Sequence, residues 1–167
     1  MAANEHKNLQ DANRHNPMGF EAAANNTVLS KGAGTGVAEI DGALSWAFPI
    51  ESFVVALSDE TTALTTGDAK ITFRMPYAFE LTGVRASVTT APTGSVLTVD
   101  IEEGGSTILS TLLTIDVSEK TSTTAATPAV ISDSALADDS EITMNIDTIG
   151  SGTAGAGLKV TLIGYQV

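Results

Sequence analysis

The residues of this chain best suited to chemistry are carboxylates that cluster in turn-like stretches. They are Asp59-Glu60, Glu102-Glu103, Asp133, and Asp138-Asp139 with Glu141. Two carboxyl groups facing one another about 5–10 Å apart across a bound sugar can hydrolyse a glycosidic bond. A sugar site also needs aromatic side chains for stacking, and Trp46, Tyr77 and Tyr165 are scattered along the chain. We therefore interpret the acids as solvated turn residues, and keep a polysaccharide depolymerase as a third hypothesis.

Other kinds of chemical site are also incomplete. Loop carboxylates at 133–141 have the hard oxygen ligands that Ca²⁺ prefers, but the chain has no EF-hand loop. His6 and His15 lie nine residues apart without a metal-binding spacing, and no histidine follows them to activate a nucleophile. The glycine-rich stretches at 32–36 and 150–157 do not match a phosphate-binding loop, so we interpret them as loops or close-packed backbone. The sequence predicts a non-enzymatic protein without metal or cofactor.

Composition and charge exclude two classes of partner. The chain has 167 residues, 43% of them hydrophobic, a net charge of −12 and no cysteine. Residues 51–167 contain five basic and fifteen acidic residues, and such a surface repels nucleic acid and anionic membranes. The N-terminus is polar from its fourth residue and no stretch reaches about 18 apolar residues, so we expect neither a signal peptide nor a membrane span.

From about residue 50 the apolar residues recur with period 2, which is typical of half-buried β-strands. Gly83 shifts the phase of this alternation and predicts a bulge, while Gly104-Gly105 predicts a hairpin turn. Leu109, Thr111, Leu113, Ile115 and Val117 recur with this period and predict one strand over residues 109–117. The apolar positions of the expected strands are Phe53, Val55, Leu57; Ile71, Phe73, Met75; Phe79, Leu81; Val84, Ala86, Val88; Leu97, Val99, Ile101; Leu109, Leu113, Ile115, Val117; Ala129–Ile131; Ile142, Met144, Ile146; and Leu158, Val160, Leu162.

About eight strands separated by short turns predict an all-β fold. Beyond ALADD at 135–139, this part of the chain has no convincing helix. We expect an antiparallel β-sandwich of the jelly-roll or a related Greek-key type over residues 50–167. Residues 1–49 are expected to form an extended N-terminal arm.

The arm is the strongest indication of function. Residues 7–46 are too poor in apolar side chains to form a core, so an ordered arm must pack on a partner. Ile40, Leu44, Trp46 and Phe48 form an isolated apolar set, and such sets mark interfaces. We predict Ile40, Leu44 and Phe48 at an oligomer interface.

Two parts of the chain resemble structural proteins of tailed bacteriophages. The arm motif is similar to the N-terminal anchor of head-fibre or capsid-associated decoration proteins, and consists of Asp11, Asn13, His15, Pro17 and Gly19, then Ala23, Asn25, Val28-Leu29, and the Gly32/Gly34/Gly36 run that ends at Trp46. Residues 68–104 and 141–164 are similar to a β-sandwich module of phage head- and tail-associated proteins.

The resemblance implies a virion protein, often a homotrimer, that binds major capsid or neck proteins. It places the anchor at Asp11, Asn13, His15, Pro17, Gly19 and Trp46. The alternative is a receptor- or glycan-binding module of a phage fibre or tail that recognises a host-surface glycan. In that case Tyr77 and three distal loops would form the binding surface: Asp59–Asp68, Thr89–Gly94 and Asp133–Glu141.

Overall fold

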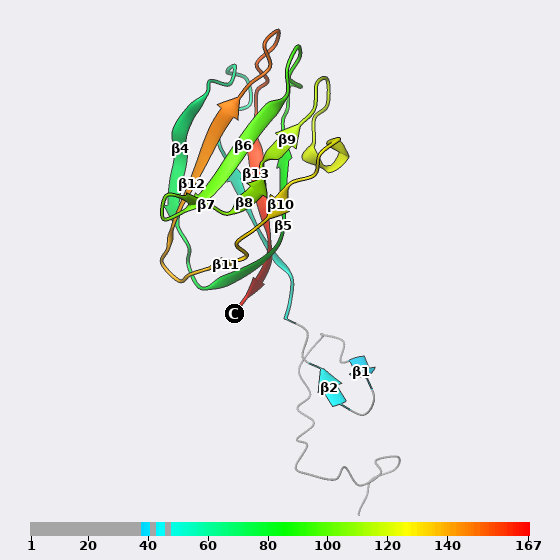
Figure 1. Ribbon diagram of the computed structural model, residues 1–167, viewed down its shortest axis with the longest axis vertical. Coiled ribbons are helices and arrows are strands. Elements are labelled where there is room, and N and C mark those ends of the chain that lie inside the picture. Colours follow the sequence, from blue (N-terminus) through cyan, green and yellow to red (C-terminus); the bar gives the residue numbers. More distant parts are fainter. Residues whose placement is uncertain (1–37, 41–42, 46–47) are drawn as a thin grey trace, which may run out of the picture. The chain divides into compact units, whose positions relative to one another are not determined.

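The computed structural model describes residues 38–40, 43–45 and 48–167. The chain divides into two compact units, Met1–Trp46 and Ala47–Val167. In the first, strand β1 (Ala38–Ile40) pairs antiparallel with β2 (Ala43–Ser45). The second is built of strands and one 3₁₀ turn, η2 (Ser122–Thr124) (Figure 1). The predicted boundary between residues 49 and 50 stays a prediction.

The second unit contains two main antiparallel sheets. In sheet one the order is β11-β5-β13-β3; in sheet two it is β4-β12-β6-β7, with β9 also paired to β6. Strands β8 and β10 form a small third sheet. The strands are β3 (Glu51–Ala56), β4 (Gly67–Arg74), β5 (Phe79–Ser87), β6 (Leu97–Glu103), β7 (Ser106–Thr107), β8 (Leu109–Thr111), β9 (Leu113–Ile115), β10 (Val130–Ile131), β11 (Ala135–Leu136), β12 (Glu141–Thr148) and β13 (Lys159–Gln166).

The connectivity is that of a jelly roll. The strands can be grouped into eight stretches in chain order. Strands β3 to β6 are stretches 1 to 4, β7–β9 together are stretch 5, β10–β11 are stretch 6, and β12 and β13 are stretches 7 and 8. Sheet one then has the order 1-8-3-6 and sheet two 2-7-4-5. This arrangement of two interleaved Greek keys defines the jelly roll. The predicted all-β, jelly-roll-like antiparallel sandwich is confirmed.

The core follows the predicted alternation. Leu97, Val99 and Ile101 are buried on β6, while the intervening polar residues are half-exposed. The same alternation buries Val160 and Leu162 on β13. Removing these aliphatic side chains from water is the main favourable contribution to folding.

The predicted bulge and hairpin are both present. Gly83 lies opposite Ile163, but Leu81 lies opposite Gly164, so Thr82 is the extra residue of a bulge in β5. Gly104 and Gly105 have φ values of 56° and 81° and connect β6 to β7. A tight hairpin with positive φ at both central residues is a type I′ turn, which glycine adopts without strain.

Two sequence-based expectations were wrong. Residues 109–117 do not form one strand: β8 pairs with β10 while β9 pairs with β6. ALADD at 135–139 is not helical, because Ala135 and Leu136 pair with Glu80 and Phe79 at the edge of β5. Burial of Leu136 on this sheet outweighs the helical propensity of Ala and Leu, which is insufficient in a segment of five residues.

Candidate functional site

Loops from distant parts of the sequence are joined at one end of the sandwich. The N–H of Leu64 donates to the carbonyl of Gly155 (2.9 Å), and the N–H of Thr89 donates to the carbonyl of Ala156 (2.9 Å). The N–H of Thr93 donates to the carbonyl of Thr153 (2.9 Å). The predicted loops 59–68 and 89–94 therefore meet here, and both contact the glycine-rich loop 150–157.

The glycines of loop 150–157 permit this close packing. A Cβ on Gly157 would lie 2.2 Å from the Thr89 hydroxyl, and its φ of +71° favours glycine. A Cβ on Gly150 would lie 1.9 Å from the carbonyl oxygen of Thr153. The interpretation of GSGTAGAG as close-packed backbone is confirmed.

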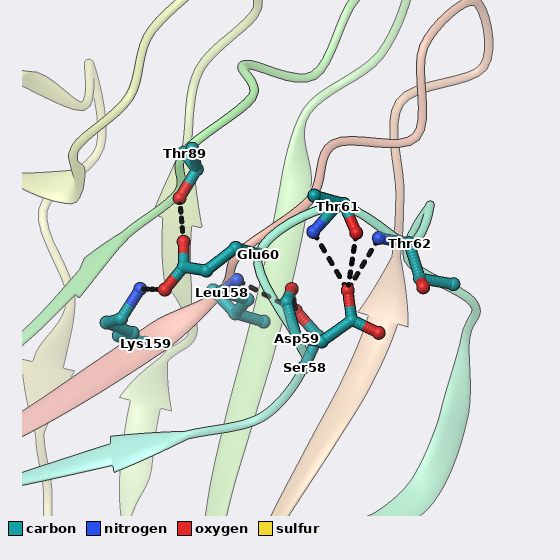
Figure 2. Close-up of polar contacts among 8 residues, drawn as sticks. All are labelled: Ser58, Asp59, Glu60, Thr61, Thr62, Thr89, Leu158 and Lys159. Carbon is teal, nitrogen blue, oxygen red and sulfur yellow. Dashed lines mark hydrogen bonds and ion pairs between the residues drawn. The ribbon is translucent and has the colours of Figure 1, made fainter.

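Both carboxylates of the first acidic pair hold this loop cluster together (Figure 2). Glu60 accepts hydrogen bonds from the Lys159 ammonium group and the Thr89 hydroxyl. Asp59 Oδ1 accepts from the backbone N–H groups of Thr61 (2.8 Å) and Thr62 (2.6 Å). The two carboxylates therefore serve to order the loop.

These hydrogen bonds favour the ionised forms. Hydrogen bonds from the hydroxyl and backbone N–H of Thr62, then from the backbone N–H of Thr61, lower the pKa of Asp59 to about 2. The bond from Lys159, followed by that from Thr89, lowers the pKa of Glu60 below its ordinary value. A general acid needs a pKa near the working pH, so neither carboxyl is suited to protonate a leaving group.

The lowered pKa of Asp59 gives a pH prediction. Its ionised form stabilises the loop at pH values above the unfolded pKa of about 3.9. That contribution is lost as the pH falls through the folded pKa of about 2. The difference in urea midpoint between the wild type and Asp59→Ala should therefore be largest above pH ~4 and shrink toward pH ~2.

The control for this experiment is Asp59→Asn, which keeps an oxygen acceptor but does not titrate. Neither variant has a titratable side chain at position 59. The difference in urea midpoint between Asp59→Asn and Asp59→Ala should therefore stay constant over the same pH range. A wild-type difference that stays constant from pH ~5 to ~2 would contradict the assignment.

The third predicted loop, Asp133–Glu141, lies at the opposite end of the sandwich (Figure 1). The N–H of Met75 donates to the carbonyl of Ser140 (3.0 Å) at the start of β12. Arg74 donates to the carbonyl of Asp139 (2.9 Å) and pairs with the Glu141 carboxylate (3.3 Å). The three loops therefore do not form one binding surface, because the first two meet at one end of the sandwich and the third lies at the other.

The Ca²⁺ interpretation fails on geometry. In the part of the chain that the structure describes, no group of three or more His, Cys, Asp or Glu residues could hold a metal ion. Asp133, Asp138, Asp139 and Glu141 are neighbours in sequence but do not converge on one point.

The tyrosines lie at the end of the sandwich that carries the third loop, away from the cluster of loops 59–68, 89–94 and 150–157. Tyr77 donates its hydroxyl to Glu51, which raises the pKa of Tyr77. Its ring packs 5.9 Å from that of Phe53. Tyr165 stacks on Phe48, with centroids 5.3 Å apart. Tyr77 packs among the rings of Phe53 and Phe79, and its hydroxyl is bound to Glu51. Substitution of Tyr77 would therefore not test a glycan site at the cluster of loops 59–68, 89–94 and 150–157.

One hollow of the sandwich is a groove that the sequence did not indicate. It has a volume of about 560 Å³ and lies between β5 at Thr82–Arg85 and the segment 122–131. This is within the usual range of ligand pockets, about 300–1,000 Å³. Its lining supplies hydroxyl groups, the Arg85 guanidinium and apolar surface from Pro128 to Ile131. Such a lining can bind a ligand but has no carboxylate or imidazole for catalysis.

All six residues of the predicted anchor lie outside the described residues: Asp11, Asn13, His15, Pro17, Gly19 and Trp46. Ile40 and Leu44 fall on β1 and β2, of which the structure describes the backbone. Phe48 is 59% exposed despite its stacking on Tyr165, and Ile50 beside it is 73% exposed. The interface role of Ile40, Leu44 and Phe48 stays a prediction.

The sequence matches no known protein family, and the search among curated proteins found no relative. Within the described residues, no helix is long and apolar enough to cross a membrane.

Proposed function

We propose that this chain is a non-enzymatic structural protein of a tailed-bacteriophage virion. Residues 1–49 hold it on capsid or neck proteins, and the sandwich is displayed outward. The observation that carries the proposal is the jelly-roll connectivity of the second unit. Jelly rolls recur in viral capsid proteins and lectins, and the step from fold to function is an analogy.

Three of the carboxylates make structural contacts, which supports a non-enzymatic role. Asp59 and Glu60 bond within the loop cluster, and Glu141 pairs with Arg74. The acidic surface of the second unit keeps a displayed domain soluble and away from nucleic acid. Such a protein contributes shape and attachment to the particle.

Deletion of residues 1–46 tests the anchor. The sandwich should still fold, because its core lies within residues 57–162, but its content in assembled particles should fall more than about tenfold, the effect of losing about 1.4 kcal/mol of binding. Quantitative mass spectrometry of purified particles measures the content, and circular dichroism of the free protein verifies folding.

The control is Thr143→Ala, which removes a half-buried hydroxyl from β12 in sheet two, whereas residues 1–46 precede β3 of sheet one. This variant should enter particles at the wild-type level. Normal incorporation of the folded truncated protein would reject the arm as the anchor.

A second candidate function is recognition of a host-surface glycan, favoured by the groove beside Arg85. Hydroxyl-lined hollows on jelly rolls suit sugars, and lectins use this fold. In a glycan array, binding should be lost in Arg85→Ala and retained in Arg74→Ala, whose guanidinium pairs with Glu141 elsewhere. Uniform background signal on all glycans would remove this candidate.

A further inference from the structure

Strand β3 ends sheet one and exposes its backbone. Its inner edge pairs with β13, and no described strand pairs with its outer edge. Just beyond the strand ends, the N–H of Leu57 donates to the carbonyl of Leu158, the residue before β13 (2.9 Å). Because bonded and non-bonded residues alternate along an antiparallel pair, Ser52, Val54 and Ala56 direct their N–H and C=O groups outward.

The outer edge of β3 also lacks the features that usually prevent strand addition. Natural edges carry lysine or proline, contain a bulge, or are very short. The sequence ESFVVA has neither residue, spans six positions and pairs with β13 in uninterrupted register. Val54 is 64% exposed on it. The one charge, Glu51, is engaged by the Tyr77 hydroxyl.

The corresponding edge strand of sheet two is protected. Strand β4 carries Asp68, Lys70 and Arg74, and its register with β12 shifts between Met144 and Ile146. The other terminal strands, β7, β9 and β11, have two or three residues each. Within the described part of the chain, β3 is therefore the one long terminal strand that has no register shift and is nearly uncharged.

We propose that β3 is a self-association edge, to which the β3 strand of a second copy of this chain adds in antiparallel orientation. A register centred on Val54 places Val54 opposite Val54 and Ser52 opposite Ala56. All outward N–H and C=O groups of these residues then find partners. Glu51 falls opposite Leu57 of the other copy, so like charges do not face each other. The two-fold operation makes the interface isologous.

Apolar residues beside the strand enlarge this interface. Six residues at about 3.3 Å each make an edge roughly 20 Å long, and a stable complex buries about 800 Å² per partner. Phe48 and Ile50 precede β3 and are 59% and 73% exposed, so they supply apolar contact next to the paired strands. Added salt should strengthen the association, because it screens the repulsion between two acidic copies.

The test is the mass of the full chain in solution as a function of concentration, by sedimentation or light scattering. We expect a monomer–dimer equilibrium whose Kd rises more than about tenfold in Val54→Lys. Val54 is exposed, so this substitution leaves the core intact. Thr72→Lys, an exposed position on β4, is the matched control and should not change Kd.

Hydrogen exchange provides a second readout. The amides of Ser52, Val54 and Ala56 should become protected as concentration rises in the wild type but not in Val54→Lys. A monomer at every concentration, a dimer unaffected by Val54→Lys, or amide protection independent of concentration would overturn the proposal. A trimer would also overturn it, since edge pairing is two-fold. None of these results bears on the anchor, because the proposal does not depend on residues 1–46.

Discussion

Replacing Phe79 by alanine should lower the free energy of unfolding by about 3–5 kcal/mol, the usual cost of removing a buried phenyl ring. Phe79 is completely buried at the start of β5. Its ring lies edge-on to that of Phe53, with centroids 5.1 Å apart, and 6.4 Å from that of Tyr77. Removal of the Phe79 ring leaves a cavity that the neighbouring side chains fill only in part. It also removes the aromatic contacts with Phe53 and Tyr77. Urea denaturation measures the loss as a lower midpoint at unchanged slope.

Phe48→Ala is the matched control for this substitution. It removes the same side chain from a position that is 59% exposed and contacts the ring of Tyr165. We expect a loss of no more than about 1.5 kcal/mol, the upper value for one aromatic pair. Equal losses in the two variants would mean that Phe79 is not the centre of the aromatic cluster.

Gly164→Ala should destabilise the sandwich by about 1–3 kcal/mol or more, as expected when atoms are forced into a filled space. An added Cβ would lie 2.0 Å from the Glu80 carbonyl oxygen and 2.7 Å from the Phe79 ring. The first of these contacts is with backbone held in the β5–β13 pair, so relief requires movement of a central strand. Thermal or urea unfolding of the purified protein measures the effect.

Gly83→Ala is the control. Gly83 lies on β5, the hydrogen-bonded neighbour of β13, opposite the residue that precedes Gly164. A Cβ there would lie 4.0 Å from Ile163, which is ordinary contact. This variant should gain up to about 1 kcal/mol of stability, which is typical of a glycine-to-alanine change without steric conflict. A Gly83→Ala loss as large as that of Gly164→Ala would contradict the steric explanation.

The sequence predicted those parts of the fold that depend on local alternation. Period 2 identified the buried faces, as at Val160 and Leu162, because every other side chain of a strand points toward the core. The phase change at Gly83 located a bulge, because one extra residue inverts which side chains point inward. Together with turn spacing, these patterns were sufficient for the jelly-roll prediction.

Features that depend on distant partners were not predictable in this way. Asn145 has the sequence context of an exposed strand residue, yet it is buried beneath the β4 bulge. Its Oδ1 accepts the N–H of Ala69 (2.8 Å), and Ala69 adopts a φ of +48° that no local pattern indicates. The groove likewise arises because segment 122–131 starts against β5, where Ser122 accepts the N–H of Ala86, but ends with Val130 and Ile131 paired to β8.

The first and last strands of the sandwich, β3 and β13, are hydrogen-bonded neighbours, and the chain enters β3 at the end where β13 finishes (Figure 1). Tension applied through the start of β3 against the loops 59–68, 89–94 and 150–157 would run along the axis of β3. The bonds between β3 and β13 would then be loaded together in shear instead of opening one after another. A jelly roll attached in this way should resist pulling far better than its thermodynamic stability alone suggests.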